Sequence, residues 1–379
     1  MSSASSSSSE GNQASDYPTT GGDFHYEPGC TRSDHRMCPS AVTRPIRPIV
    51  AQFEERDCTY EMNILGSIAQ VEFCNAKNVG EIHDPRVLHE AVGIFVRNGI
   101  QLGKEELAKF EALKFIVKIG SGLTKIDLKS AGEMGIAVSH ITGFGIEEAA
   151  DSALRMILNC FRRTLSLQKS LTRGYLKDCR SERTRSIASQ HCIRVRGKTL
   201  GLIGFGQVAK AVAVRAVIFG LKVMFYDPYI TNGNEISYGI VRAKNLGDLL
   251  TQSDCVSLHC SLKMQNYFLV DATTIQLMRH GACLVNISDE SLIENSALAN
   301  GLRDGRIRTA ALQVSRNFDG AAFNGVPNLY RTTKIAQFSE ASLKEFREAA
   351  ATEMKAYLEE GMMSEHLQYL RNGMFIGVQ

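Results

Sequence analysis

A glycine-rich turn after an apolar run carries the clearest chemistry in this sequence. Residues 200–203 are apolar, and a helical run follows the turn. The pattern G-x-G-x-x-A between them consists of Gly204, Phe205, Gly206, Gln207, Val208 and Ala209. In such a context the first glycine allows a tight turn, the second lets the backbone approach a pyrophosphate, and the small third residue lets helix and strand pack closely. The pattern predicts a dinucleotide site, and the alternative is a glycine-rich turn without a ligand.

An acidic residue in the right place supports the first alternative. The next predicted strand, residues 221–226, ends in Asp227, about twenty residues beyond the glycine turn. A carboxylate there would bind the ribose hydroxyls of NAD and repel the additional phosphate of NADP. The two features together predict an NAD site that begins at Gly204 and ends at Asp227.

The elements that must position this site alternate between strands and helices. We predict strands at residues 47–52, 69–74, 93–96 and 115–119, with a helical pattern at 104–113 between them, and this alternation implies a parallel sheet. A long amphipathic helix is predicted over residues 147–167, and a second βα series starts at Thr199. The sequence therefore predicts an α/β fold with two Rossmann-like units in tandem.

Composition excludes several classes of protein. The chain has 379 residues, 44% of them hydrophobic, and its 43 Lys and Arg against 40 Asp and Glu leave a formal charge of +3. A balance this close to neutral predicts no direct binding of nucleic acid or of a membrane. Residues 1–46 are rich in Ser and lack periodicity, so we expect a disordered tail. Its His and Cys residues follow no strong ligand spacing, and we predict no metal site.

Several segments together resemble one family. They are residues 56–62, 119–122, 126–127, 147–148, 225–229 and 253–260, which read RDCTYEM, IGSG, ID, EE, FYDPY and SDCVSLHC. This set is similar to the C-terminal-binding proteins, the NAD-linked transcriptional corepressors of the D-2-hydroxyacid dehydrogenase superfamily. The resemblance implies a flavodoxin-like substrate or partner domain, residues 47–141 plus 347–379, into which a doubly wound NAD-binding domain, residues 142–346, is inserted.

The resemblance fails at the catalytic positions. Hydride transfer in this superfamily uses an Arg that clamps the substrate carboxylate, a His that exchanges a proton, and a Glu that orients the His. By alignment these positions are occupied by Asp289, Lys334 and Phe318 respectively. We therefore expect Asp289 to repel a carboxylate, and we keep Lys334 as an alternative proton carrier. The sequence predicts that no catalytic residue is intact.

Cofactor positions have drifted less. The resemblance implies contacts with NAD from the glycine turn, from Asp227, and from Ser121, Cys260, Asp289 and Gln313. Gln207 and Lys263 depart from the residue types that are usual in the family, and Ala149 replaces a residue that is often Thr. We expect NAD to bind, with lower affinity than in relatives.

The family also has a cleft in its first domain that receives a short peptide of the type Pro-x-Asp-Leu-Ser. Val87 fits this cleft as an apolar lining residue, whereas Glu72 stands where relatives have a small Ala. An unpaired carboxylate there costs desolvation and would repel the Asp of the peptide. We expect a weakened affinity for the usual motif.

Three functions follow from these observations. The leading hypothesis is a catalytically inactive, NAD(H)-binding corepressor, dimeric and located in the nucleus or in both nucleus and cytoplasm, with transcription factors or repressor complexes as partners. The second is an NAD-dependent D-2-hydroxyacid dehydrogenase with an altered site. The third is a cofactor-free interaction scaffold. Turnover separates the second from the first, and titration with NADH separates the first from the third.

Overall fold

The structure is a computed structural model. It describes residues 47–53, 57–97, 99–120, 123, 125–141, 143–172, 181–189, 192–231, 233–316, 318–326, 328–361, 369–371 and 374–376. The predicted tail, residues 1–46, lies outside them. The unit Arg47–Gln379 contains two sheets.

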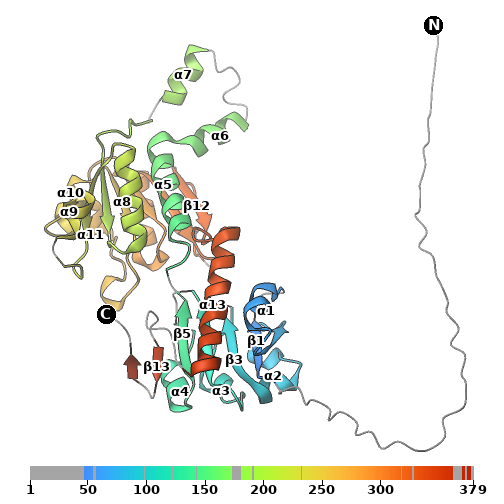
Figure 1. Ribbon diagram of the computed structural model, residues 1–379. Coiled ribbons are helices and arrows are strands. Elements are labelled where there is room, and N and C mark those ends of the chain that lie inside the picture. Colours follow the sequence, from blue (N-terminus) through green and yellow to red (C-terminus); the bar gives the residue numbers. More distant parts are fainter. Residues whose placement is uncertain are drawn as a thin grey trace, which may run out of the picture. The chain divides into compact units, whose positions relative to one another are not determined.

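The first sheet is built mainly from the N-terminal strands, with the order β14-β13-β5-β4-β3-β1-β2 (Figure 1). Strands β1 to β5 pair in parallel, and β13 and β14 add an antiparallel edge. Their bounds are Ile49–Phe53 (β1), Gln70–Cys74 (β2), Ala91–Val96 (β3), Phe115–Ile119 (β4), Ala137–Ile141 (β5), Tyr369–Arg371 (β13) and Met374–Ile376 (β14). The short helices of this part are α1 (Thr59–Leu65), η1 (Val79–Glu81), α2 (Pro85–Glu90), α3 (Lys104–Leu107) and α4 (Leu128–Glu133). The helix that we predict over 104–113 is thus a single turn.

The second sheet is parallel and has the order β12-β11-β10-β9-β6-β7-β8. Its strands are β6 (Thr199–Ile203), β7 (Lys222–Tyr226), β8 (Val241–Arg242), β9 (Cys255–Leu258), β10 (Ala282–Asn286), β11 (Ile307–Val314) and β12 (Leu329–Thr333). The chain builds β7 and β8 on one side of β6 and then returns to build β9 on its other side. Ligands of open α/β sheets bind at such a switch point, outside the carboxyl ends of the strands.

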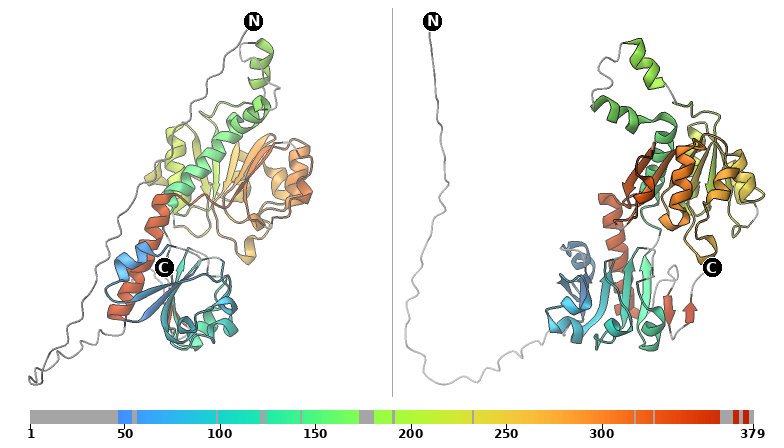
Figure 2. Two further views of the ribbon diagram at one scale, coloured as in Figure 1. Left: turned by 90° about the vertical axis from the view of Figure 1, so that its right-hand side faces the viewer. Right: turned by 180° about the vertical axis from the view of Figure 1, so that it is seen from behind.

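Helices cover both faces of the second sheet. On the face toward the viewer in Figure 1, α5 (Ile146–Arg162) and α8 (Gln207–Ile218) share one core, and seen from behind the orange helix α12 (Asn295–Arg303) covers the other face (Figure 2). The remaining helices are α6 (Thr164–Thr172), α7 (Glu182–Ser189), α9 (Asn234–Tyr238), α10 (Leu246–Gln252), η2 (Met264–Asn266), α11 (Ala272–Leu277), η3 (Glu290–Leu292) and η4 (Ala321–Phe323). The fold class that we predict is therefore confirmed.

One helix is shorter than predicted. The amphipathic pattern over 147–167 predicts one continuous helix, but α5 ends at Arg162 because Arg163 adopts a left-handed conformation with φ of 56°. The side chain of Asn159 accepts a hydrogen bond from the backbone N–H of Leu165 across this break, at 2.9 Å. The chain then continues as α6, a separate helix with no buried residues.

Helix α13 (Glu340–Glu360) brings the chain back to the first sheet, where it packs against β4 and α1 (Figure 1). Phe346 and Met354 lie in the core that it forms there. The buried Arg347 donates from Nε to Oε1 of the buried Glu61 at 2.8 Å, which ties α13 to α1. The boundary that we predict between residues 346 and 347 thus falls inside α13. Among the described residues, no helix is long and apolar enough to cross a membrane.

The two segments that connect the sheets touch each other. Gly145 precedes α5 with φ of 67°, and a Cβ there would lie 2.4 Å from the carbonyl oxygen of Gln337. Ser339 Oγ donates to Glu148 Oε1 at 2.6 Å. The segment that leads from the first sheet to α5 is therefore in contact with the segment that leads from the second sheet to α13.

Candidate functional site

The glycine turn between β6 and α8 admits no side chain at its first position. Gly204 has φ of 86°, and a Cβ there would lie 2.8 Å from the backbone nitrogen of Cys260 and 2.9 Å from its Cα. Left-handed backbone favours glycine, and the backbone of Cys260 cannot move aside without disturbing β9. The turn therefore requires the glycine that the sequence motif predicts.

The second glycine borders an open space. Gly206 precedes α8 in an extended conformation, φ −73° and ψ −171°, and a Cβ there would meet no atom within 4 Å. No side chain caps α8, so the first N–H groups of this 12-residue helix are left to a ligand. Ala209, the third motif residue, is buried in the core of the domain. This geometry fits a pyrophosphate at the predicted place.

Phe205 takes part through its backbone alone. Its ring is fully buried and stacks on Phe225, with centroids 4.1 Å apart. Its N–H donates to Asp227 Oδ2 at 2.8 Å, and the N–H of Tyr229 donates to Oδ1 of the same carboxylate at 2.9 Å. Two backbone amides thus fix Asp227 at the end of β7, where it can accept hydrogen bonds from ribose hydroxyls.

These residues surround a cavity of about 400 Å³ at the carboxyl ends of β6 and β7. Its lining includes Gly204, Gly206, Tyr226, Asp227, Pro228, Tyr229, Leu246, His259, Cys260, Ser261 and Lys263. Lys263 Nζ lies 3.9 Å from the centroid of the Tyr229 ring. The cavity combines apolar walls with one carboxylate and one ammonium group, which suits the adenosine half of a dinucleotide.

Two titratable groups in this lining are unsuited to acid-base chemistry at neutral pH. His259 Nε2 lies 2.9 Å from Ser257 Oγ, and burial lowers the pKa of the imidazole to about 4, so the ring is neutral. Burial likewise raises the pKa of the Cys260 thiol. Both residues line the site without supplying a charge.

The remaining predicted cofactor residues are placed differently. Gln207 and Val208 form the first turn of α8, and Gln313 is buried near the carboxyl end of β11, opposite Thr332 in the ladder. Ser121 lies outside the described residues. Its contact with NAD stays a prediction.

Asp289 and Lys334, which we predict to stand at the Arg and His positions of the family, form an ion pair. Lys334 Nζ lies 3.5 Å from Asp289 Oδ2 and 3.6 Å from Glu290 Oε2. Burial raises the pKa of Asp289, but the backbone N–H of Ser291, which it caps at 2.9 Å, and the charge of Lys334 outweigh burial and hold this pKa below its usual value. The charge that we expect to repel a carboxylate is therefore largely compensated by Lys334.

Glu290 is a site residue that the sequence analysis missed. Its Oε2 accepts from the backbone N–H of Ser315 at 2.7 Å, and its Oε1 accepts from Ser315 Oγ at 2.5 Å. It therefore joins the end of β11 to the segment after β10. Its position next to Asp289 in a segment that follows a buried strand was the available signal.

Phe318, at the family's Glu position, is part of an aromatic contact. Its ring stacks on Phe323 with centroids 5.9 Å apart, and it packs against the core that contains α12. A phenyl ring has no oxygen that could accept a hydrogen bond from an imidazole N–H and no negative charge that could stabilise an imidazolium.

Lys118 is a second residue that the analysis missed. It lies in β4 beside His140 of β5, is 1% exposed, and donates from Nζ to the carbonyl oxygen of Ile119 at 3.4 Å. A lysine at the carboxyl end of an otherwise apolar strand is rarely buried without a role. The run FIVKI at residues 115–119 contained this signal.

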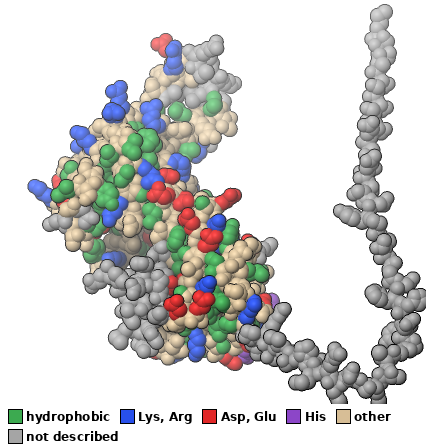
Figure 3. Space-filling model, in the orientation of Figure 1, with side chains coloured by type: hydrophobic (Ala, Val, Ile, Leu, Met, Phe, Trp, Pro, Cys, Tyr) green, Lys and Arg blue, Asp and Glu red, His purple; other side chains and the backbone are tan. Residues whose placement is uncertain are grey.

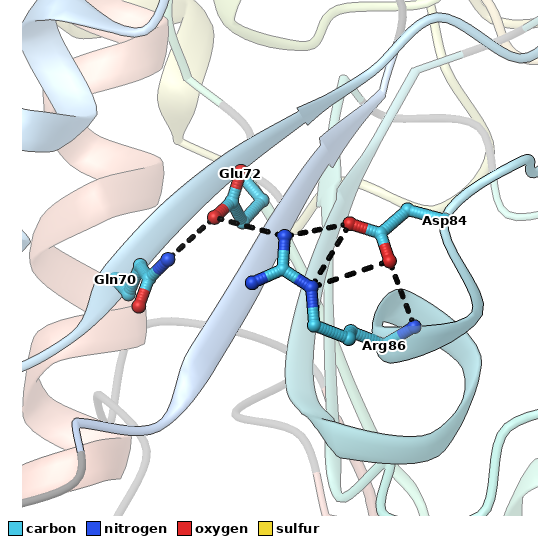
Figure 4. A network of polar contacts seen from close by, with 4 residues as sticks. All are labelled: Gln70, Glu72, Asp84 and Arg86. Carbon is cyan, nitrogen blue, oxygen red and sulfur yellow. Dashed lines mark hydrogen bonds and ion pairs between the residues drawn. The ribbon is translucent and has the colours of Figure 1, made fainter.

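The two residues that we predict to line a partner cleft are Glu72, on the edge strand β2, and Val87, on α2. Glu72 Oε1 accepts from Gln70 Nε2 at 2.5 Å and lies 3.9 Å from Nη2 of Arg86, which in turn donates to Asp84 Oδ2 at 2.8 Å (Figure 4). Val87 is buried beneath this network. The prediction of an unpaired Glu72 is therefore wrong, because α2 supplies a guanidinium beside it.

Charged side chains of both signs are present on the face of the molecule that Figure 3 shows. On the face shown in Figure 3, Lys and Arg side chains are spread over the upper part, while Asp and Glu side chains gather lower down. Arg215 of α8, for example, pairs with Asp151 of α5 at 2.7 Å. On this face we find no continuous basic patch of the kind that binds a phosphate backbone.

Comparison with known proteins agrees with this geometry. The family model described as "D-isomer specific 2-hydroxyacid dehydrogenase, NAD binding domain" matches residues 154–333. C-terminal-binding protein 1 of Caenorhabditis elegans is 40% identical over 316 residues, which are 82% of this chain and 43% of the relative. D-3-phosphoglycerate dehydrogenase of Methanocaldococcus jannaschii is 30% identical over 67% of this chain and 46% of its own length. The chain thus spans less than half the length of these curated relatives.

Among solved structures, the D-lactate dehydrogenase of Aquifex aeolicus complexed with NAD and lactic acid superimposes with a TM-score of 0.69. It is 23% identical, and the match covers 83% of this chain and 98% of that one. This likeness confirms the fold.

Proposed function

Since this chain belongs to the D-2-hydroxyacid dehydrogenase superfamily and is similar to a C-terminal-binding protein in particular, we propose that it is an NAD(H)-binding, corepressor-like protein without dehydrogenase activity. NAD is the cofactor of its family domain. The glycine turn, the uncapped start of α8 and the fixed carboxylate of Asp227 would hold its phosphates and adenosine ribose. When bound, the nicotinamide ring supplies hydride chemistry.

The ion pair between Lys334 and Asp289 is the observation that carries the inactivity. A substrate carboxylate needs a cation that is free to clamp it, and the cation at this place is already held by two carboxylates within 3.6 Å. Phe318 offers no acid or base. The residues around the reacting position therefore favour cofactor binding without turnover.

Dimerisation through the NAD-binding domain is the second part of the proposal. A cavity along α5 and α6 is lined by Leu154, Leu158 and Leu165 beside Arg155 and Arg162. Leu171 of α6 is 61% exposed and none of the described residues of this helix is buried. A second copy of the chain packed on these helices would cover this apolar surface.

The partner and the compartment complete the proposal. The proposed peptide site is the surface around Glu72 of β2 and Val87 of α2, with transcription factors or repressor complexes as partners, and the nucleus, or nucleus and cytoplasm, as the location. The charged network of Glu72, Asp84 and Arg86 at this site favours a motif other than Pro-x-Asp-Leu-Ser.

One pair of measurements tests the central claim. Isothermal calorimetry with NADH is expected to show binding, and a keto-acid assay on the same preparation is expected to show turnover near background. Heat without turnover supports the proposal, turnover supports the dehydrogenase alternative, and absence of both heat and thermal stabilisation at millimolar NADH supports the scaffold.

A further inference from the structure

The strand order implies that the two halves of the cofactor lie over different strands of the second sheet, one on each side of the switch point. The cavity for the adenosine half lies at β6 and β7, on one side of the switch point. A dinucleotide crosses the sheet at this point, so its nicotinamide half must lie over the carboxyl ends of the strands on the other side, which begin with β9 and β10. Asp289 and Glu290 follow β10 directly.

The charged groups on this side carry a net negative charge. Asp289 and Glu290 contribute two carboxylates, and Lys334 contributes one ammonium group that contacts both. Lys334 follows β12, the edge strand, whereas the carboxylates follow β10, two strands nearer to the switch point. The negative end of the cluster therefore faces the crevice.

Other groups of this region do not reverse that sign. His259, after β9, is neutral at physiological pH because burial lowers its pKa to about 4. Arg316, which follows β11, and Arg331, which lies within β12, are exposed, where water and salt screen them. The guanidinium of Arg331 also lies close to Gly320. A Cβ added at this glycine would lie 2.5 Å from Nη1 of Arg331.

We propose that Asp289 and Glu290 make this site selective for the oxidised cofactor, so that NAD⁺ binds more tightly than NADH. The nicotinamide ring carries a positive charge in NAD⁺ and none in NADH, and the two forms are otherwise alike. A net unit charge that acts over about 10 Å through an effective dielectric of about 20 to 40 corresponds to a roughly four- to sixteenfold difference in Kd. The proposal rests on the proposed function, since it requires the cofactor to bind.

The test compares the Kd of NAD⁺, NADH and ADP-ribose by isothermal calorimetry on the full chain. ADP-ribose lacks only the nicotinamide ring and reports the affinity of the rest of the cofactor. The wild type is expected to favour NAD⁺ over NADH by about four- to sixteenfold. Asp289→Asn and Glu290→Gln are expected to reduce this ratio. Asn keeps an oxygen that accepts from the N–H of Ser291, and Gln keeps an oxygen that accepts from the N–H of Ser315 while its amide NH2 donates to Ser315 Oγ.

Lys334→Gln separates charge from structure. Removing the compensating cation is expected to raise the ratio of the two Kd values, the opposite of the effect of Asp289→Asn, although both changes break the same ion pair. A merely structural contribution would change both affinities in parallel and leave the ratio constant. Glu359→Gln on α13, which removes one charge from an exposed pair with Lys355, serves as the matched control.

The outcomes distinguish the two claims. Equal affinities for NAD⁺ and NADH, a preference for NADH, or a ratio that Asp289→Asn and Lys334→Gln shift in the same direction overturns the selectivity and leaves the proposed function intact. If the folded protein binds neither nucleotide nor ADP-ribose, the proposed function fails, and the selectivity fails with it.

Discussion

Lys334 and Asp289 lie far apart in the sequence, yet their Nζ and Oδ2 atoms are 3.5 Å apart at the carboxyl ends of β12 and β10. We predict that Asp289 stands at the position of the family's carboxylate-clamping Arg and Lys334 at the position of its proton-carrying His. In this chain the side chains of Lys334 and Asp289 form an ion pair with each other. The charge of Lys334 is therefore already held by carboxylates of the chain, and a substrate carboxylate would have to compete with Asp289 and Glu290 for it.

We predict that the purified protein does not reduce small 2-keto acids with NADH above background. At the positions that we align with the family's Arg and His, Asp289 cannot clamp a carboxylate and Lys334 is held by Asp289 and Glu290. Each such catalytic group is typically worth about a hundredfold or more in rate. A spectrophotometric assay at 340 nm measures this, with an active relative as the positive control.

A restoration series makes this prediction sharper. Asp289→Arg alone is expected to recover keto-acid binding with little turnover. Combining it with Lys334→His and Phe318→Glu is expected to recover some turnover. Robust reduction by the wild type that Lys334→Ala abolishes would instead establish Lys334 as a proton donor.

The two motif glycines are expected to differ when each is replaced by Ala. Gly204→Ala places a Cβ against the backbone of Cys260 in a left-handed conformation, so we expect it to destabilise the protein by about 1–3 kcal/mol. Gly206→Ala points its Cβ into open space and leaves the melting temperature unchanged, yet it blocks the approach of the pyrophosphate and weakens NADH binding by tenfold or more. Thermal melting and calorimetry on both variants check this, and equal stability of the two would contradict the geometry of the turn.

We predict that NAD(H) binds in preference to NADP(H), and that Asp227→Ala loses this preference. The carboxylate is held by the N–H groups of Phe205 and Tyr229, so it cannot turn away from a ribose phosphate. Calorimetric titration with NADH and NADPH measures the ratio. Asp248→Ala, on α10, is the control for loss of one surface carboxylate, and a ratio that Asp227→Ala leaves unchanged would count against the assignment.

NAD(H) is expected to favour the dimer. The proposed dimer surface on α5 and α6 belongs to the domain that binds the cofactor, and α5 packs directly on α8. A ligand that binds the dimer more tightly shifts the equilibrium by that difference in affinity. Sedimentation velocity with and without saturating NADH measures the shift, and identical distributions would refute the coupling.

Two substitutions at the proposed peptide site are expected to change peptide affinity in opposite directions. Glu72→Ala is expected to tighten binding of a Pro-x-Asp-Leu-Ser peptide, because it removes a negative charge near the Asp of the peptide. Arg86→Ala is expected to weaken it, because Glu72 and Asp84 lose their common partner. Fluorescence anisotropy with a labelled peptide measures both, and unchanged affinity in both variants would show that the network faces away from the peptide site.

Features that depend on neighbouring residues in the chain could be predicted from the sequence, whereas contacts that depend on the packing of distant elements could not. The glycine turn and Asp227 follow their strands directly, so their positions at the carboxyl ends of β6 and β7 could be inferred from the motif. The break at Arg163 could not, because it depends on one left-handed residue within an uninterrupted amphipathic pattern. The pairing of Lys334 with Asp289, and of Arg86 with Glu72, could not be inferred either, since strand and helix packing brings these residues together.

The contact between the outgoing and the returning chain has an architectural consequence. Gly145 lies against Gln337, and Ser339 bonds to Glu148, so both ends of the NAD-binding domain are adjacent. When the two ends of a domain are adjacent, the domain can be deleted and replaced by a short linker without displacing the strands of the first sheet. The same closeness allows such a module to be inserted into a loop of an unrelated protein, where it would act as a transplantable nucleotide sensor.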